Sequence, residues 1–162
     1  MNIEDLLWFI KLIWKILPAY IANASPVIFI KNGHPIDFNR KFIDNKPLFG
    51  RGKTIEGFII GILSGTIVGI LQNRILAALM LSIGAMCGDL IGSFIKRRLD
   101  IGRGGPAPIL DQTSFLFGAI ILSSLIEKFT LFEIIILVVI TIPLHFITNV
   151  IAFLLKIKKV PW

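Results

Sequence analysis

Residues 75–95 form an apolar run of membrane-spanning length that contains a single charged residue, Asp89. A transmembrane helix needs about 20 such residues. A charge near the middle of a bilayer costs roughly 3 to more than 10 kcal/mol, so an intramembrane carboxylate normally faces a protein cavity and a partner. The run therefore predicts a membrane helix with a functional carboxylate.

Helical spacing places Asp89, Ser93 and Lys96 on one face, at positions i, i+4 and i+7. Arg97 and Arg98 follow at the edge of the run. One face then carries a carboxylate inside the membrane and a cation at its surface. This arrangement predicts a site for a metal-bound phosphate.

The composition predicts an all-α integral membrane protein, since 55% of the residues are hydrophobic and the mean hydropathy is +0.83. The first apolar run contains Lys11, Lys15 and Pro18 without a small-residue cleavage site, so we expect it to remain in the mature protein. Cys87 is the only cysteine, which excludes an internal disulfide and a cysteine metal cluster.

The apolar runs predict about five transmembrane helices in one domain covering residues 1–162, with the first interrupted by Pro18 and Pro26 and the last kinked near Pro143. The expected spans are approximately 6–30, 57–71, 75–96, 109–127 and 131–155. Cations are concentrated in the loops 31–56 and 97–110 and at the C-terminus. The positive-inside rule places these three regions in the cytoplasm and the N-terminus outside, with a polar cavity open to the cytoplasm.

Glycines recur every four residues at 57, 61, 65 and 69, and again at 84, 88 and 92. Each set lies on one helix face, where another backbone can approach closely. Helix packing is the favoured interpretation. A groove for an isoprenoid or acyl chain on one of the two faces is the alternative.

Asp89 and Asp111 enter the membrane from the two sides of the 97–110 loop, at comparable depth. Two carboxylates together with water and substrate phosphate oxygens are a usual coordination of Mg²⁺, a hard ion that prefers oxygen. The pair predicts a magnesium site. Pairing of each carboxylate with Lys or Arg alone is the structural alternative.

The segment 50–54 (GRGKT) precedes the second span but fails the P-loop pattern, because Pro47 stands where the first glycine is required. Its glycines, Lys53 and a helix start capped by Thr54 could still bind an anion. A solvated loop charge is equally compatible with Lys53. Neither His34 nor His145 lies in a zinc-binding pattern, and His145 is interpreted as a hydrogen-bonded core histidine.

Three motifs together resemble the cytidylyltransferases that make CDP-linked membrane lipids. The signature of the CDP-diacylglycerol synthases has three parts. In chain order they resemble Ser93, Lys96 and Arg97, then the loop 103–106 (RGGP), and then Asp111. The shorter archaeal family, the CDP-archaeol synthases, resembles the chain more closely, in the segments 17–23 (LPAYIAN), 52–57 (GKTIEG) and 88–98 (GDLIGSFIKRR). The chain departs from the bacterial signature at Gln112 and at Ser114, which stands where that signature has a second aspartate.

The resemblance implies a Mg²⁺-dependent transfer of CMP from CTP to an unsaturated isoprenoid ether-lipid glycerol phosphate, giving CDP-archaeol and pyrophosphate. It implies that Asp89 and Asp111 bind the metal ion and that Lys96 is a catalytic residue. Asp100 is a further candidate metal ligand. The residues expected to bind the substrates are Lys53, Thr54, Arg97 and Arg103, with Asn23 and Ser93 as weaker candidates. We expect CTP, the lipid phosphate and the membrane as partners and no nucleic acid, and a homodimer is compatible with the sequence.

The main alternative is a small transporter or lipid translocator that uses Asp89 and His145. Transport predicts polar residues through the whole depth of the membrane, whereas the polar residues here cluster at the cytoplasmic ends of the spans, except in the last span. The motifs of CDP-alcohol phosphotransferases and of H-x-x-x-x-D acyltransferases are absent from the sequence.

Overall fold

The computed structural model describes residues 2–102, 104–158 and 160, and within them the chain forms five α-helices. They are α1 (Ile3–Phe29), α2 (Ile55–Leu71), α3 (Ile75–Arg98), α4 (Pro108–Ser123) and α5 (Leu131–Leu154). The predicted all-α membrane fold is confirmed, and each expected span corresponds to one helix.

The five helices differ in whether they are long enough to cross a bilayer. α1, α3 and α5 are both long and apolar enough. α2 and α4 have 17 and 16 residues, which corresponds to about 25 Å at 1.5 Å per residue, somewhat less than the hydrocarbon core of about 30 Å. Five complete crossings therefore remain a prediction.

Local signals account for the helix starts. Capping boxes begin α1 at Asn2 and α5 at Thr130. Thr54 caps α2, as predicted, since its hydroxyl accepts a hydrogen bond from the Gly57 amide at 3.1 Å.

The expected interruption of the first span is not observed, because α1 continues through Pro18 and Pro26 as one helix of 27 residues. α5 continues through Pro143 as one helix, and the kink expected there remains a prediction. Membrane helices tolerate proline because neighbouring helices and local adjustments satisfy the freed backbone groups.

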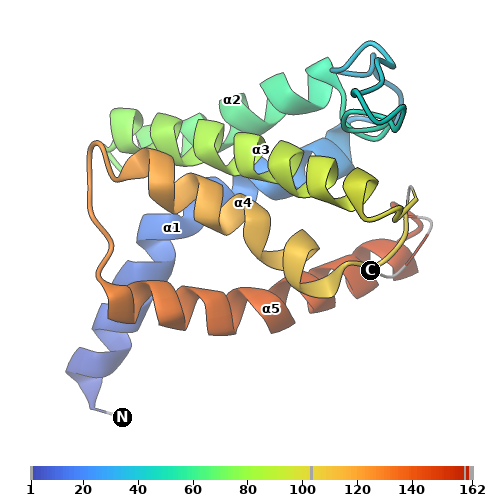
Figure 1. Cartoon of the computed structure of the whole chain (residues 1–162). Helices are drawn as coiled ribbons and strands as arrows, with labels where there is room; N and C mark the ends of the chain where they lie inside the picture. Colours follow the sequence, from blue (N-terminus) through green and yellow to red (C-terminus); the bar gives the residue numbers. More distant parts are fainter. Residues whose placement is uncertain (1, 103, 159, 161–162) are drawn as a thin grey trace.

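The long loop 30–54, the C-terminal end of α3 and the C-terminus lie at one end of the molecule, while the N-terminus and the two short turns lie at the other (Figure 1). We call these the loop end and the turn end. The cation-rich segments thus share one end of the molecule, and the side of the membrane on which that end lies remains a prediction.

Both glycine stripes lie at helix contacts. A Cβ on Gly61 would stand 2.8 Å from the Ala22 carbonyl oxygen, and one on Gly65 would stand 2.5 Å from that of Pro18. On α3, a Cβ on Gly84 would stand 2.8 Å from the Ala119 Cα of α4. These faces are filled by neighbouring helices, as the packing interpretation predicts.

Candidate active site

A cavity of about 880 Å³ opens at the loop end, between the ends of the helices and the two long loops. Its described polar wall includes Tyr20, Asn23, Lys53, Thr54, Asp89, Lys96, Asp111, Thr141, His145, Asn149 and Lys158. Six of the predicted site residues thus come together in one cavity, although they derive from three helices, α1, α3 and α4, and from the long loop before α2.

The first carboxylate of the site, Asp89 of α3, is paired with Lys53 at the start of α2. The Lys53 Nζ lies 2.5 Å from Asp89 Oδ2, and the two side chains are 28% and 25% exposed. The Thr54 cap fixes the beginning of α2 directly after Lys53. The pair therefore joins the long loop to the middle helix of the molecule at the cavity wall.

The second carboxylate, Asp111, lies in the first turn of α4. Lys96 Nζ donates to both of its oxygens at 2.9 Å and to the Gly105 carbonyl oxygen at 2.8 Å. The Ala107 amide also donates to Asp111 Oδ2, at 3.2 Å. Asp111 and Lys96 thus set the position of the loop between α3 and α4 as well as lining the cavity.

The donor set fits a magnesium ion that is shared with a substrate. Among the residues that the structure describes, no group of three or more His, Cys, Asp or Glu side chains could hold a metal ion alone. Asp89 and Asp111 line one cavity and each already binds a cationic ammonium group. Two carboxylates completed by phosphate oxygens and water are the coordination that Mg²⁺ favours.

Two other predicted residues, Ser93 and Arg97, are not among the described residues that line the cavity. Ser93 is buried within α3. Arg97 donates to the Gly102 carbonyl oxygen at 3.2 Å and lies beside Gly50. Arg103 lies outside the described residues.

Ser114, which departs from the bacterial signature, and Asp100, the further candidate metal ligand, both contact other parts of the chain. Ser114 contacts α3, since a Cβ on Gly92 would stand 2.5 Å from its hydroxyl oxygen. Asp100 is 77% exposed and pairs with Lys46 at 2.7 Å.

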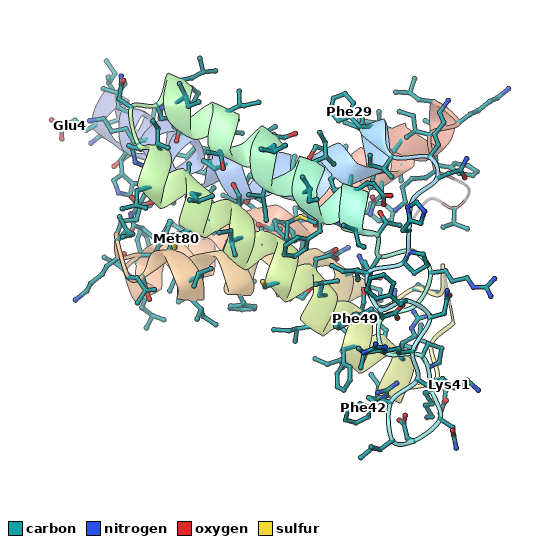
Figure 2. The ribbon with its side chains drawn as sticks, turned by 90° about the horizontal axis from the view of Figure 1, so that it is seen from above. Glu4, Phe29, Lys41, Phe42, Phe49 and Met80 are labelled. Atoms are coloured by element: carbon teal, nitrogen blue, oxygen red, sulfur yellow. The ribbon has the colours of Figure 1, made fainter. Side chains whose placement is uncertain are left out.

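The long loop is attached to the end of α3 by contacts that the sequence pattern did not indicate. Arg98 pairs with Asp44 at 2.9 Å, donates to the Pro47 carbonyl oxygen and stacks against Phe42 and Phe94. Figure 2 shows Phe42 and Lys41 beside the C-terminal end of α3.

Within this loop, the buried carboxylate of Asp37 accepts hydrogen bonds from the amides of Asn39, Phe49 and Gly50 at 2.9 to 3.0 Å. Burial raises the pKa of Asp37, but these backbone donors outweigh it and hold the pKa below its usual value. The ionised carboxylate therefore stabilises the turn that leads into Lys53.

The sequence analysis missed the contribution of α5. His145 is hydrogen-bonded, as predicted, since its Nδ1 lies 3.1 Å from Asn149 Nδ2, but it lines the cavity instead of the core. The spacing of Thr141, His145 and Asn149 by four residues was the available signal, because it places all three on one helix face. Lys158, beyond the helix, donates to Asn149 Oδ1 at 3.0 Å.

Comparison with known proteins gives consistent matches over nearly the whole chain. The family model of the CarS-like CDP-archaeol synthases matches residues 3–78 and 73–162. The CDP-archaeol synthase of Methanopyrus kandleri is 44% identical over 94% of this chain and 92% of its own, and that of Pyrobaculum islandicum is 46% identical over 98% and 99%.

A solved structure described as an intramembrane enzyme for archaeal membrane lipid biosynthesis is also similar. It has a TM-score of 0.79 and 36% identity, over 85% of this chain and 92% of its own. The shared sequence and the shared helical architecture lead to one conclusion: the chain belongs to the CDP-archaeol synthase family of membrane enzymes.

Proposed function

We propose that this enzyme transfers CMP from CTP to the phosphate of an unsaturated isoprenoid ether lipid, with Mg²⁺, and releases pyrophosphate. The observation that carries the proposal is the pair of carboxylate–lysine contacts on the wall of one cavity, Lys53–Asp89 and Lys96–Asp111. Membership of the family supports the activity and the class of lipid.

The chemistry does not require a protein base. A phosphate monoester has a second pKa near 6, so it is largely ionised at neutral pH. One of its oxygens can form the bond to the α-phosphorus of CTP while the bond to the β-phosphate oxygen breaks. The leaving group is pyrophosphate, and no proton must be removed from the attacking oxygen.

The main obstacle is repulsion between the two polyanionic substrates. Asp89 and Asp111 would hold Mg²⁺, which when bound neutralises charge on the triphosphate and polarises its phosphoryl oxygens. Lys53 and Lys96 are bound to these carboxylates, so their ammonium groups are positioned to donate to phosphate oxygens. Lys53 also stands at the N-terminus of α2, where the helix dipole favours an anion.

The cavity also has apolar wall residues suited to a lipid. Val27 and Ile28 of α1 and Leu144 and Ala152 of α5 line it. Such contacts discriminate weakly between tails, by about 1 to 3 kcal/mol per methylene. The cation-rich loops at the same end support placing the N-terminus outside and the C-terminus and active site in the cytoplasm.

Transport is less well supported. A polar path would have to continue from the cavity to the turn end. Beyond Tyr20 and Thr141 in that direction, the buried core of the described chain contains Leu12, Ile16, Leu81 and Leu137. The buried hydroxyls there, Ser82 and Ser123, donate to carbonyl oxygens of their own helices.

The decisive experiment measures pyrophosphate release by the purified protein in detergent, with CTP and either the unsaturated ether lipid phosphate or phosphatidic acid. We expect release that depends on Mg²⁺ and CTP, with a modest preference for the ether lipid. Equal use of ATP, or no release with any lipid phosphate offered, would overturn the proposal and favour the transporter.

A further inference from the structure

Three polar side chains of the cavity have no part in the chemistry described so far: His145 and Asn149 of α5, and Lys158 of the C-terminal tail. All three line the cavity. They are joined in a row, with Lys158 Nζ donating to Asn149 Oδ1 at 3.0 Å and Asn149 Nδ2 lying 3.1 Å from His145 Nδ1.

The backbone turn after α5 brings Lys158 back to the cavity. Lys156 adopts a positive φ of 58°. The amides of Ile157 and Lys158 both donate to the Ala152 carbonyl oxygen, at 2.9 and 3.1 Å. These bonds close the helix end with a left-handed residue, as at many helix C-termini, and reverse the tail. Val160 then lies beside Gly104 of the second loop.

The hydrogen-bond directions fix the tautomer of His145. An ammonium group only donates, so Asn149 Oδ1 is the acceptor for Lys158. The Asn149 amide nitrogen must then donate to His145 Nδ1, which leaves the ring neutral with its proton on Nε2. The row therefore presents an N–H donor at His145 and a cation at Lys158.

The charge of the cavity favours an anion at this position. Its described wall carries two carboxylates, Asp89 and Asp111, and five cationic side chains: Lys31, Arg51, Lys53, Lys96 and Lys158. Burial lowers the pKa of Lys158, and the charge of Asp111 opposes this while Lys53 and Lys96 add to it. An anion placed among these cations would relieve their mutual repulsion.

The row and Lys53 lie on different elements of the cavity wall. Lys53 lies on the glycine-rich loop at the start of α2, whereas the row lies on α5 next to the apolar wall residues Leu144 and Ala152. Ile147 and Ile151 of the same helix are exposed on its outer surface, where a membrane protein meets lipid. A lipid phosphate can thus contact α5 twice, through its phosphate group at the row and through its tail at the apolar residues.

We infer that Lys158, with Asn149 and His145, is the binding site for the phosphate monoester of the lipid substrate. The inference rests on the proposed function. Lys158 and His145 donate to phosphate oxygens, and Asn149 is a positioning residue that holds both.

The test compares Lys158→Gln with Lys156→Gln, an exposed lysine two residues away on the same tail. We expect Lys158→Gln to raise the KM for the lipid phosphate about tenfold, the scale of one charged hydrogen bond, and to leave the KM for CTP within about twofold. Lys158→Arg should restore most of the lipid affinity, and Lys156→Gln should change neither constant. A raised KM for CTP alone, or no change in either constant, would overturn the inference.

A binding measurement without CTP separates this inference from the proposed function. Wild-type protein should bind the ether lipid phosphate more tightly than the corresponding lipid alcohol, and Lys158→Gln and Asn149→Leu should remove most of that difference. If the wild type makes no CDP-lipid but this difference persists, the proposed function fails and the phosphate site stands. If the wild type is active and the variants bind both lipids as it does, only the phosphate site fails.

Discussion

The two ends of the molecule use the same kind of interaction for different purposes. At the loop end, Lys53–Asp89 lines the cavity, and at the turn end Arg74–Glu127 connects the α2–α3 turn to the α4–α5 turn. Exposure does not distinguish them, since the side chains are 28% and 25% exposed in the first pair and 28% and 20% in the second. A shielded ion pair in a membrane protein is therefore not evidence of a functional site by itself.

The surroundings of the pairs make the difference. Arg74 binds both carboxylate oxygens of Glu127, and nearby Lys15 donates to the Lys128 carbonyl oxygen and lies over the Phe129 ring. These charges are satisfied by protein groups that belong to the turns. At the loop end the pairs face a cavity of about 880 Å³, and under the proposed function substrate phosphates and a metal ion would replace their partners.

The largest expected contrast is topological. In a Cys87→Ala background, we expect cysteines at Lys41 and Gly102 to react with a membrane-impermeant reagent from the cytoplasmic side and a cysteine at Lys128 from the outside. The reason is that the loop end and the turn end are opposite ends of the molecule, and the positive-inside rule predicts that the cation-rich loop end is cytoplasmic. All three positions are exposed or face open space. Labelling of Lys41 and Gly102 from opposite sides would separate the two loops and remove the shared site.

The next largest effect concerns the carboxylates of the loop end. Asp89→Asn and Asp111→Asn retain the volume but remove the charge, so each should lower kcat by roughly a hundredfold or more, the scale of removing one electrostatic stabiliser. The thermal unfolding temperature in detergent should change little for Asp89→Asn, because the Lys53 ammonium group that it leaves without a counter-ion faces the cavity and can be solvated there. Near-normal turnover of either variant at saturating Mg²⁺ would exclude that carboxylate from the metal site.

At the turn end, Glu127→Gln should give the opposite result. It leaves the shielded Arg74 guanidinium without its counter-ion, which should lower the free energy of unfolding by roughly 1 to 3 kcal/mol. Steady-state kinetics at a temperature well below unfolding should stay within about twofold of the wild type. A large fall in kcat for the folded variant would mean that the turn end takes part in the reaction.

Lys53→Ala tests whether the cation of the loop end binds nucleotide or only balances Asp89. The lysine stands at a helix N-terminus, a favourable position for phosphate, so its loss should raise the KM for CTP about tenfold with a smaller change for the lipid phosphate. The matched variant is Lys46→Ala, which removes a partly exposed loop cation that pairs with Asp100 and is not among the described cavity-lining residues. Equal effects of the two substitutions would make Lys53 an ordinary loop charge.

The sequence predicted the parts of the site that depend on local patterns. The cost of a charge in an apolar run identified Asp89, the short distance along the chain to α4 associated Asp111 with it, and the side chain of Thr54 indicated the start of α2. The attachment of the long loop by Arg98 and Asp44 could not be predicted, because the conformation of a loop depends on contacts distant in sequence. Lys158 could not be predicted either, since the tail reverses at Lys156, a non-glycine residue with positive φ that no turn motif marks.

The smallest expected effect is that of Lys15→Met, which tests whether the turn end tolerates the loss of the contacts of one lysine. Lys15 lies 3.8 Å from Glu133 and 3.9 Å from the Phe129 ring centroid, and its side chain is 22% exposed. The ion pair, the cation–π contact and the exposed hydrogen bond to the Lys128 carbonyl oxygen are weak because water can replace each partner, so together they contribute about 1 kcal/mol. Methionine retains the apolar stem of the side chain. The free energy of unfolding should therefore fall by no more than about 1 kcal/mol, with both KM values unchanged. A loss as large as that of Glu127→Gln would show that Lys15, which joins α1 to the α4–α5 turn, is the principal connection of the turn end.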